Sequence, residues 1–261
     1  MATVPDNLLV AEKVRKEFGG LIATDDIDFT IPHGSIVALI GPNGAGKTTL
    51  FNQITGVYVP TSGSIVFDGT EVVGKPPHAI VELGVGRTFQ NIRLFAQMTA
   101  IENVLVGMHC RLRGGIVSSV VRTPRVRREE REARDRAREL LIYCGLPRRH
   151  EEYAGTLPYG DQRRLEVARA LATNPTLVLL DEPTAGMNPQ ETADFIAFVT
   201  RMRDEKDVTV LLIEHDMKVV MGVSERITVL EYGAKIAEGT PAEIRADERV
   251  IEAYLGRGAA A

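Results

Sequence analysis

The sequence has 261 residues, enough for one large domain with an inserted lobe and for a substantial hydrophobic core. Its 44% hydrophobic and 25% charged residues are typical of a soluble globular protein, and its net charge of −4 gives no reason to expect nucleic acid as a partner. No apolar run approaches the roughly 20 residues that span a bilayer, and the N-terminus lacks the features of a signal peptide. We therefore expect a cytoplasmic protein, and Cys110 and Cys144, which lack metal-binding or redox spacing, fit a reducing compartment.

The first part of the chain combines two kinds of strand. Residues 8–14 read as a strand, and residues 27–31 alternate apolar and polar side chains as a half-exposed strand does. Residues 35–40 are apolar on both faces, which is typical of a buried strand in a parallel sheet. Another short strand is predicted over residues 63–69, between turn residues. This pattern mixes an antiparallel part with a parallel core.

Directly after the buried strand, residues 41–48 read Gly-Pro-Asn-Gly-Ala-Gly-Lys-Thr and fit the phosphate-binding pattern G-x-x-x-x-G-K-[ST] at every fixed position. Glycines let the backbone wrap a polyphosphate with its N–H groups pointing inward, and the helix predicted over residues 48–55 directs its positive end at the anion. Lys47 is expected to reach the β- and γ-phosphates, and the Thr48 hydroxyl to ligate Mg²⁺. The pattern predicts that the protein binds a nucleoside triphosphate. The nucleotide-binding residues predicted here are Gly41, Pro42, Asn43, Gly44, Ala45, Gly46, Lys47, Thr48 and Thr49.

From about residue 91 to residue 156 the sequence is helical in character. Residues 99–102 have the spacing of a capping box ahead of the apolar run 103–106. A highly charged helix is predicted over residues 125–144, where arginine and acidic side chains are interleaved as they are on a solvated face. Contact of these arginines with anionic lipid head groups is an alternative. The apolar side of this helix carries Ala133, Ala137, Leu140, Leu141 and Cys144.

The alternation of strands and helices resumes after this segment, and we find no internal repeat. The predicted elements are a helix over 157–173, a buried strand over 176–180, a helix over 190–204, a strand over 208–213, a helical piece over 218–221, and a hairpin of 227–230 with 234–238.

Polar residues follow three of the predicted strands. The strand 35–40 leads into the phosphate loop, the strand 176–180 ends in Asp181 and Glu182, and the strand 208–213 is followed by Glu214, His215 and Asp216. Ligands of open parallel sheets bind at the carboxyl ends of the strands, so these groups can converge on one crevice. There Asp181 is expected to hold Mg²⁺, Glu182 to deprotonate an attacking water, and His215 to hydrogen-bond the γ-phosphate.

With these motifs in this order, the chain resembles the ATP-binding subunits of ABC transporters over nearly all of its length. The resemblance implies that an aromatic residue, Phe18, stacks on adenine. It also implies that Gln90, in the sequence Arg-Thr-Phe-Gln-Asn, reaches Mg²⁺ and the attacking water. Residues 157–160, Leu-Pro-Tyr-Gly, stand at the position of the family signature. In this family two subunits face head to tail, so Gly160 is expected to contact the partner's ATP.

Two departures from the family pattern stand out. The signature usually reads Leu-Ser-Gly-Gly-Gln, whereas this chain has Pro158 and Tyr159 in place of the Ser and the first Gly. Pro158 offers neither a hydroxyl nor an N–H, so the Gly160 N–H and the helix dipole are left to bind the partner's γ-phosphate. Asn188 stands where the family usually has Asp. Both changes concern the site that this chain offers to its partner.

A finer resemblance points to the longer ATP-binding subunit of branched-chain amino-acid importers. The runs 87–95 and 98–106, the insertion around Gly114–Thr123, the Leu-Pro-Tyr-Gly signature and the ending 250–256 carry it. The resemblance implies a groove beside the glutamine loop that receives short helices of the membrane subunits. Leu94, Phe95 and Met98 are candidates for that contact, and packing within the helical lobe is the alternative.

We therefore expect an α/β fold: a P-loop NTPase core of mixed sheet and helices, an antiparallel β subdomain, and an inserted helical subdomain. One ABC ATP-binding domain would fill residues 1–261, with the core in 1–90 and 166–261 and the helical subdomain, ending in the signature, in 91–165. The expected cofactors are ATP and Mg²⁺. The expected partners are a second ATP-binding subunit (a sister chain or a second copy), two membrane-spanning permease subunits and, indirectly, a periplasmic or extracellular solute-binding protein.

The predicted function is ATP hydrolysis that drives uptake of branched-chain amino acids, at the cytoplasmic face of the inner membrane. Catalysis would rest on Lys47, Gln90, Glu182 and His215, and the metal on Thr48, Gln90 and Asp181. The alternatives are an importer ATPase for another small solute such as urea or amides, a soluble ABC ATPase that acts on nucleic acid or ribosomes, and a metabolic phosphotransferase. The last would need an acceptor pocket and has no use for the signature.

Overall fold

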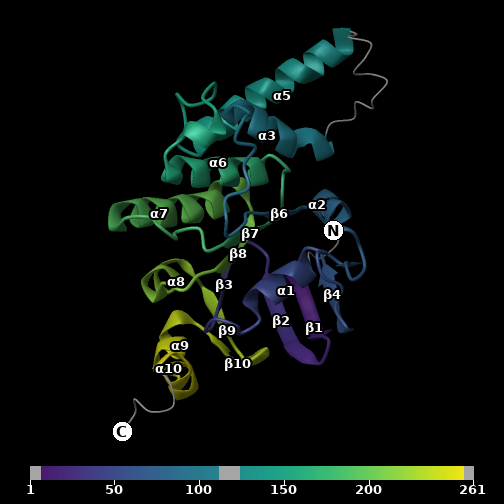
Figure 1. The fold of residues 1–261 in the computed structure, drawn as a ribbon, viewed down its shortest axis with the longest axis vertical. Coiled ribbons are helices and arrows are strands. Elements are labelled where there is room, and N and C mark those ends of the chain that lie inside the picture. The colour runs from purple at the N-terminus through teal and green to yellow at the C-terminus, as the bar shows by residue number, and fades with distance from the viewer. Residues whose placement is uncertain (1–6, 112–123, 256–261) are drawn as a thin grey trace. The chain divides into compact units, whose positions relative to one another are not determined.

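The computed structural model describes residues 7–111 and 124–255, so the insertion around Gly114–Thr123 and the end of the chain from Gly256 lie outside the described residues. The chain divides into two compact units, one of residues 1–80 and 179–261 and the other of residues 81–178 (Figure 1). Each is described by itself below. Among the described residues, no helix combines the length and the apolar character that crossing a membrane requires.

An antiparallel sheet forms the N-terminal part of the first unit. Its strands are β1 (Asn7–Phe18), β2 (Leu21–Pro32), β4 (Ser62–Phe67) and β5 (Thr70–Glu71), in the order β2-β1-β4-β5. The tight turn between β1 and β2 has Gly19 and Gly20 at φ angles of 52° and 92°, which glycine adopts at little cost. In β2, Ile27, Phe29 and Ile31 are buried while the residues between them are half-buried, as the alternating sequence predicts.

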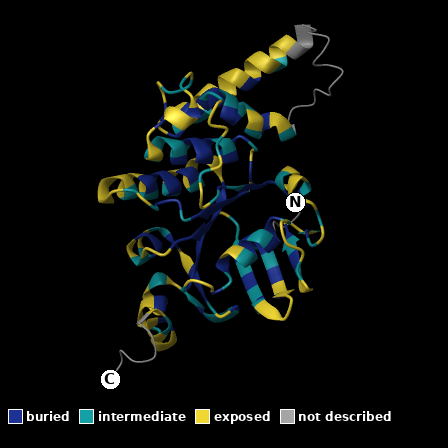
Figure 2. Ribbon diagram, viewed as in Figure 1, coloured by how far each residue is buried: buried dark blue, intermediate teal, exposed yellow. Residues whose placement is uncertain are grey.

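A second sheet with parallel strands forms the centre of this unit. It contains β3 (Ile36–Ile40), β7 (Leu177–Asp181), β8 (Thr209–Ile213), β9 (Arg226–Glu231) and β10 (Ala234–Gly239), in the order β10-β9-β3-β8-β7. β3 runs parallel to both β8 and β9, and β10 returns antiparallel to β9 as the predicted hairpin does. Every residue of β3, β7 and β8 is buried, and Figure 2 shows these strands in dark blue. The prediction of an antiparallel part beside a parallel core is confirmed.

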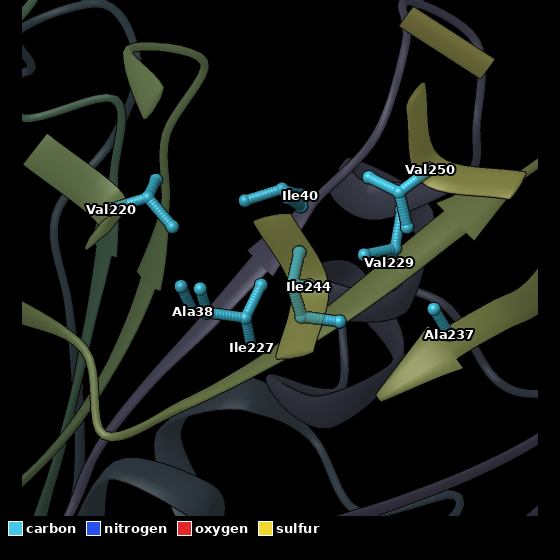
Figure 3. Close-up of a cluster of buried hydrophobic side chains, with 8 residues drawn as sticks. All are labelled: Ala38, Ile40, Val220, Ile227, Val229, Ala237, Ile244 and Val250. Atoms are coloured by element: carbon cyan, nitrogen blue, oxygen red, sulfur yellow. The ribbon is translucent and has the colours of Figure 1, made fainter. Parts of the chain in front are cut away.

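Three helices of the first unit pack against an apolar cluster on this sheet: α8 (Met217–Val223), α9 (Pro241–Ala246) and α10 (Glu248–Leu255). The unit also contains α1 (Lys47–Ile54) and α7 (Pro189–Lys206), while α2 (Pro77–Leu83) crosses the boundary between the units. The cluster in Figure 3 joins side chains of β3, β9 and β10 to Val220 of α8, Ile244 of α9 and Val250 of α10. Most predicted helix and strand ends match within two residues, but β1 ends four residues later than predicted and β2 begins six residues earlier. Helices α2, α9 and α10 were not predicted, because they are too short to give a periodic signal.

The second unit is mainly helical. It contains β6 (Val85–Arg87), α3 (Ala100–Met108), η1 (His109–Arg111), α5 (Pro124–Tyr143), η2 (Ala154–Thr156) and α6 (Tyr159–Leu171). The capping box predicted over residues 99–102 is confirmed, because the Thr99 side chain and the Glu102 side chain each accept the other's backbone N–H. The apolar side of α5 is buried at Ala133, Ala137 and Leu141.

The helix that carries the signature begins two residues later than predicted. Pro158 is its N-cap and Tyr159 its first residue, because a residue that precedes proline is disfavoured in helical conformation and Leu157 is extended. The second compact unit spans residues 81–178. The narrower helical subdomain of residues 91–165 stays a prediction.

The capping of α7 by Asn188 leads to a testable prediction. It is the N-cap of α7 in a complete capping box: its side chain accepts the Glu191 N–H at 3.0 Å, and its own N–H donates to Glu191 Oε2 at 2.9 Å. We expect Asn188→Ala to lower the free energy of unfolding by about 1 kcal/mol, because the Glu191 N–H loses its partner. Asn188→Asp keeps an acceptor and should stay close to the wild-type value in urea unfolding. Equal losses in both variants would contradict the capping role.

Candidate nucleotide site

The phosphate loop lies between β3 and α1 and is packed closely against backbone of its own unit. A Cβ atom on Gly41 would lie 2.1 Å from the Leu230 carbonyl oxygen, and one on Gly46 would lie 2.4 Å from the Ala23 carbonyl oxygen. Gly46, at φ 98°, is also the N-cap of α1. The turn between β9 and β10 supports the loop, since the Gly233 N–H donates to the Ala45 carbonyl at 3.1 Å. Glycine is therefore required at both fixed glycine positions of the pattern, by space as well as by backbone angle.

Lys47 is held inside this loop. Its Nζ donates to the carbonyl oxygens of Gly41 at 2.6 Å and Pro42 at 3.0 Å, and the residue is only 9% exposed. Burial lowers the pKa of Lys47, and the nearby carboxylates of Glu182 and Asp181 oppose that shift. The ammonium group therefore lies in the field of both acidic residues, at the place where a polyphosphate would meet the loop.

The acidic pair stands at the carboxyl end of β7. Asp181 is 3% exposed, and the Glu182 N–H donates to the carbonyl of Ile213, the last residue of β8, at 2.9 Å. Glu182 has a φ of 46°, a conformation that is uncommon for residues other than glycine and that often occurs at functional sites. Because β3, β8 and β7 are neighbours in that order, the phosphate loop, His215 and the acidic pair follow adjacent strand ends.

Glu214 organises the same end of the sheet, a role that its sequence context does not predict. It is completely buried, and its Oε1 accepts the backbone N–H of Thr184 at 3.0 Å and the Thr184 hydroxyl at 2.6 Å. Its Oε2 accepts the backbone N–H of His215 at 3.2 Å. This carboxylate thus ties the segment after Glu182 to the segment of His215, whose own side chain is 65% exposed. One feature of the sequence could have identified Glu214: its carboxylate directly follows a predicted strand, as the carboxylate of Asp181 does.

Phe18 lies at the end of β1 with 40% of its surface exposed. Its ring meets the Tyr58 ring edge-on at a centroid distance of 5.2 Å, and the Lys16 ammonium lies 5.0 Å from its centroid. An exposed aromatic face in the unit that carries the phosphate loop suits stacking on a base.

Gln90 and Gly160 belong to the second unit. Gln90 is exposed, and Gly160 is half-buried in the first turn of α6, where backbone N–H groups have no partner within the helix. Pro158 caps this helix without a side-chain hydrogen bond. The first turn of α6 can therefore offer backbone N–H groups to an anion, as expected for a signature that lacks the serine.

Mg²⁺ is usually bound by one or two protein oxygens together with substrate phosphates and water. Among the described residues, no group of three His, Cys, Asp or Glu side chains is arranged to hold a metal. The Thr48 hydroxyl, exposed at the start of α1, and the Asp181 carboxylate are oxygen donors of the right kind.

A phosphate loop on a parallel sheet, followed by acidic residues at the adjacent strand ends, defines a P-loop nucleoside triphosphatase. The sequence matches the ABC transporter family over residues 24–185, and the chain belongs to this family. Residues 234–260 match a family described as branched-chain amino acid ATP-binding cassette transporter.

Individual relatives cover almost the whole chain. The high-affinity branched-chain amino acid transport ATP-binding protein BraF of Pseudomonas aeruginosa is 49% identical over 249 residues, which cover 95% of this chain and 98% of BraF. The ADP conformation of MJ1267, an ATP-binding cassette of an ABC transporter, has a TM-score of 0.83 at 31% identity and covers 96% of this chain and 99% of that one. A dimeric structure of the cassette MJ0796, bound to ADP and Pi, has a TM-score of 0.76 at 27% identity and covers 89% and 98%. The predicted fold class and the predicted ABC-type ATPase are confirmed.

The placement of Lys47 and Glu182 predicts two different defects. We expect Lys47→Ala to weaken ATP binding as well as turnover, because the loop loses the cation that meets the phosphates. We expect Glu182→Gln to keep ATP binding and to lower turnover by about 100-fold or more, because the amide cannot take a proton from water. Fluorescent-nucleotide titration and phosphate release measure the two quantities on the full-length chain. Unchanged affinity in Lys47→Ala, or near-normal turnover in Glu182→Gln, would refute the corresponding role.

Proposed function

We propose that the chain is the ATP-hydrolysing subunit of an importer of branched-chain amino acids. The observation that carries the ATPase part is the burial of Lys47 in the phosphate loop within the field of Glu182 and Asp181. The solute is supported by the C-terminal match at residues 234–260 and by the similarity to BraF over almost the whole chain.

In this proposal the residues of the first unit bind ATP and activate water. Lys47 and the loop N–H groups hold the β- and γ-phosphates, and Phe18 stacks on the adenine. Mg²⁺, held by Thr48, Asp181 and Gln90, would supply positive charge to the phosphate oxygens. Glu182 takes a proton from the attacking water, and His215 hydrogen-bonds the γ-phosphate. Most of the rate enhancement then comes from positioning and charge stabilisation, as is usual for phosphoryl transfer.

The proposed assembly places a second ATP-binding subunit head to tail with this one, so that Gly160 contacts the partner's ATP. Dimeric association is supported by the related cassette MJ0796.

Two permease subunits would hold the pair at the cytoplasmic face of the membrane, with a solute-binding protein acting on the other side. Phe95, 49% exposed, is the best placed of the three candidates for permease contact, since Leu94 and Met98 are half-buried. No nucleic acid partner is proposed.

Uptake measurements test the proposed solute. We expect cells that carry only Glu182→Gln to lose uptake of radiolabelled leucine, because ATP hydrolysis no longer resets the transporter. Uptake of labelled urea and of an amide by the same cells serves as the control. Loss of urea or amide uptake with normal leucine uptake would reject branched-chain amino acids in favour of another small solute. Normal uptake of all three solutes, together with stimulation of the ATPase by RNA or DNA, would favour a soluble non-transport ATPase.

The composition of the ATP-bound pair can be measured separately. We expect the full-length Glu182→Gln chain, mixed with ATP and Mg²⁺, to elute as a dimer whose mass is confirmed by light scattering. The reason is that hydrolysis no longer releases ATP held between a phosphate loop and a Gly160 backbone N–H. Omission of ATP is the control and should give a monomer. If the variant binds ATP tightly but stays monomeric, two copies of residues 157–160 are not enough to form the ATP-bound pair. The signature that faces this chain's ATP would then come from a sister subunit.

A further inference from the structure

Helix α6 carries three linked side chains, two of which bond the backbone of the segment that contains Gln90 within the second unit. Tyr159, Arg163 and Glu166 are spaced by four and three residues and so share one face of the helix. Arg163 is only 2% exposed and Glu166 only 1%, which is rare for charged residues unless they are paired. No function derived above uses this buried pair.

Arg163 binds two successive backbone carbonyls of the glutamine loop. Its Nη1 donates to the Phe89 carbonyl at 2.7 Å and to Glu166 Oε2 at 3.3 Å, and its Nη2 donates to the carbonyl of Gln90 itself. The Tyr159 hydroxyl accepts from Nε at 3.2 Å and from Nη2 at 3.0 Å. These contacts occupy all five N–H groups of the guanidinium, which fixes its plane and its distance from the loop.

Glu166 binds the backbone N–H groups of the same loop whose carbonyls Arg163 binds. Its Oε1 accepts the backbone N–H groups of Phe89 and Arg93, both at 3.3 Å. Arg163 and Glu166 therefore bind carbonyls and amides of the same short segment, residues 89–93. Burial raises the pKa of Glu166, while the Arg93 amide and the Arg163 charge oppose the shift.

Tyr159 links this network to the departure from the usual family signature. It stands where a glycine is usual, directly before Gly160, and a glycine at this position could not give Arg163 a hydroxyl acceptor. The Arg163 guanidinium also lies 5.4 Å from the Tyr159 ring centroid. The unusual residue thus has a defined partner, and that partner holds the backbone of Gln90.

We propose that Tyr159, Arg163 and Glu166 are positioning residues that attach the backbone of Gln90 to the helix start that presents Gly160. The proposal rests on the proposed function, in which Gln90 serves this chain's own ATP and Gly160 serves the partner's. One bound nucleotide would then affect the other site, because the two groups move together. A displacement of about 1 Å at a catalytic group is enough to lower turnover severely, so the attachment acts on rate rather than on ATP affinity.

Tyr159→Phe is the sharpest variant, because it removes one hydroxyl and keeps the ring. In the full-length chain we expect ATP affinity close to wild type and a kcat lower by roughly tenfold, as for loss of a hydrogen bond to a charged group. We also expect half-maximal turnover to need more Mg²⁺, because Gln90 is displaced, and a purely structural role would not change that requirement. Tyr153→Phe, an exposed tyrosine of the same unit, is the matched control and should leave all three quantities unchanged.

A double-mutant cycle with Gln90→Ala separates this inference from the proposed function. If Tyr159 acts through Gln90, adding Tyr159→Phe to Gln90→Ala should lower kcat no further, whereas independent effects would multiply and overturn the proposal. Normal turnover in Gln90→Ala alone would reject the role proposed for Gln90, and the positioning role with it. A different outcome would reject the positioning role alone. In that outcome Gln90→Ala lowers kcat, whereas Tyr159→Phe has the same kcat as the control variant Tyr153→Phe.

Arg163→Lys supplies a second variant that keeps the charge. Lysine presents a point charge in place of the planar group, so it cannot bind both carbonyls and the tyrosine hydroxyl together. We expect a larger loss of kcat than for Tyr159→Phe, with ATP affinity again retained. A kcat equal to that of the wild type would show that the two carbonyl contacts do not position Gln90.

Discussion

The parallel pairing of β3 with β8 is the constraint on which the nucleotide site depends. Its register, from Ile36 opposite Val210 to Leu39 opposite Ile213, fixes where both strands end. The phosphate loop then starts beside Glu214 and His215, and the Glu182 N–H bonds the Ile213 carbonyl to bring the acidic pair to the same edge. A slip of one residue would turn every side chain of a strand to the opposite face of the sheet. Because every residue of β3, β7 and β8 is buried, such a slip would change the side-chain packing on both faces of the sheet, so core packing and site geometry are specified together.

Buried charge is concentrated where backbone segments must be held. Lys47 is enclosed by carbonyls of its own loop, and Glu214 accepts from Thr184 and from the backbone of His215. Arg163 and Glu166 hold the segment of Gln90 in the second unit. Each of these groups loses hydration on burial, and hydrogen bonds to neighbouring segments, many of them to backbone atoms, offset that loss. An apolar side chain could fill the same space, but it could not form the hydrogen bonds that hold the loop backbone in one conformation. This is a physical reason for charged side chains at these places.

The sequence was sufficient for the fold class and for the order of the motifs along the chain, and the reason lies in the kind of signal. Glycines of the phosphate loop, the buried strands and the capping box at Thr99 are local patterns that need no tertiary information. The short helices α2, α9 and α10 were not predicted because fewer than three turns give no period, and their stability comes from packing, as at Ile244 and Val250. Glu214 and Arg163 were missed for a different reason. Their roles depend on partners about 30 and 74 residues away, at Thr184 and Phe89, and no spacing rule reports such contacts.

The structure gives a physical explanation for each departure from the family pattern. Asn188 keeps the acceptor that a helix N-cap needs, so its exchange for aspartate changes a charge but not the capping hydrogen bond. Pro158 sits at the N-cap, where its missing N–H has no helical partner to lose, and it leaves the N–H groups of the first turn free of helical partners. Tyr159 replaces a residue without a side chain by an acceptor for Arg163. Compared with the usual family signature, this stretch lacks the serine hydroxyl and has a tyrosine hydroxyl that accepts from Arg163, whose guanidinium also donates to the carbonyls of Phe89 and Gln90.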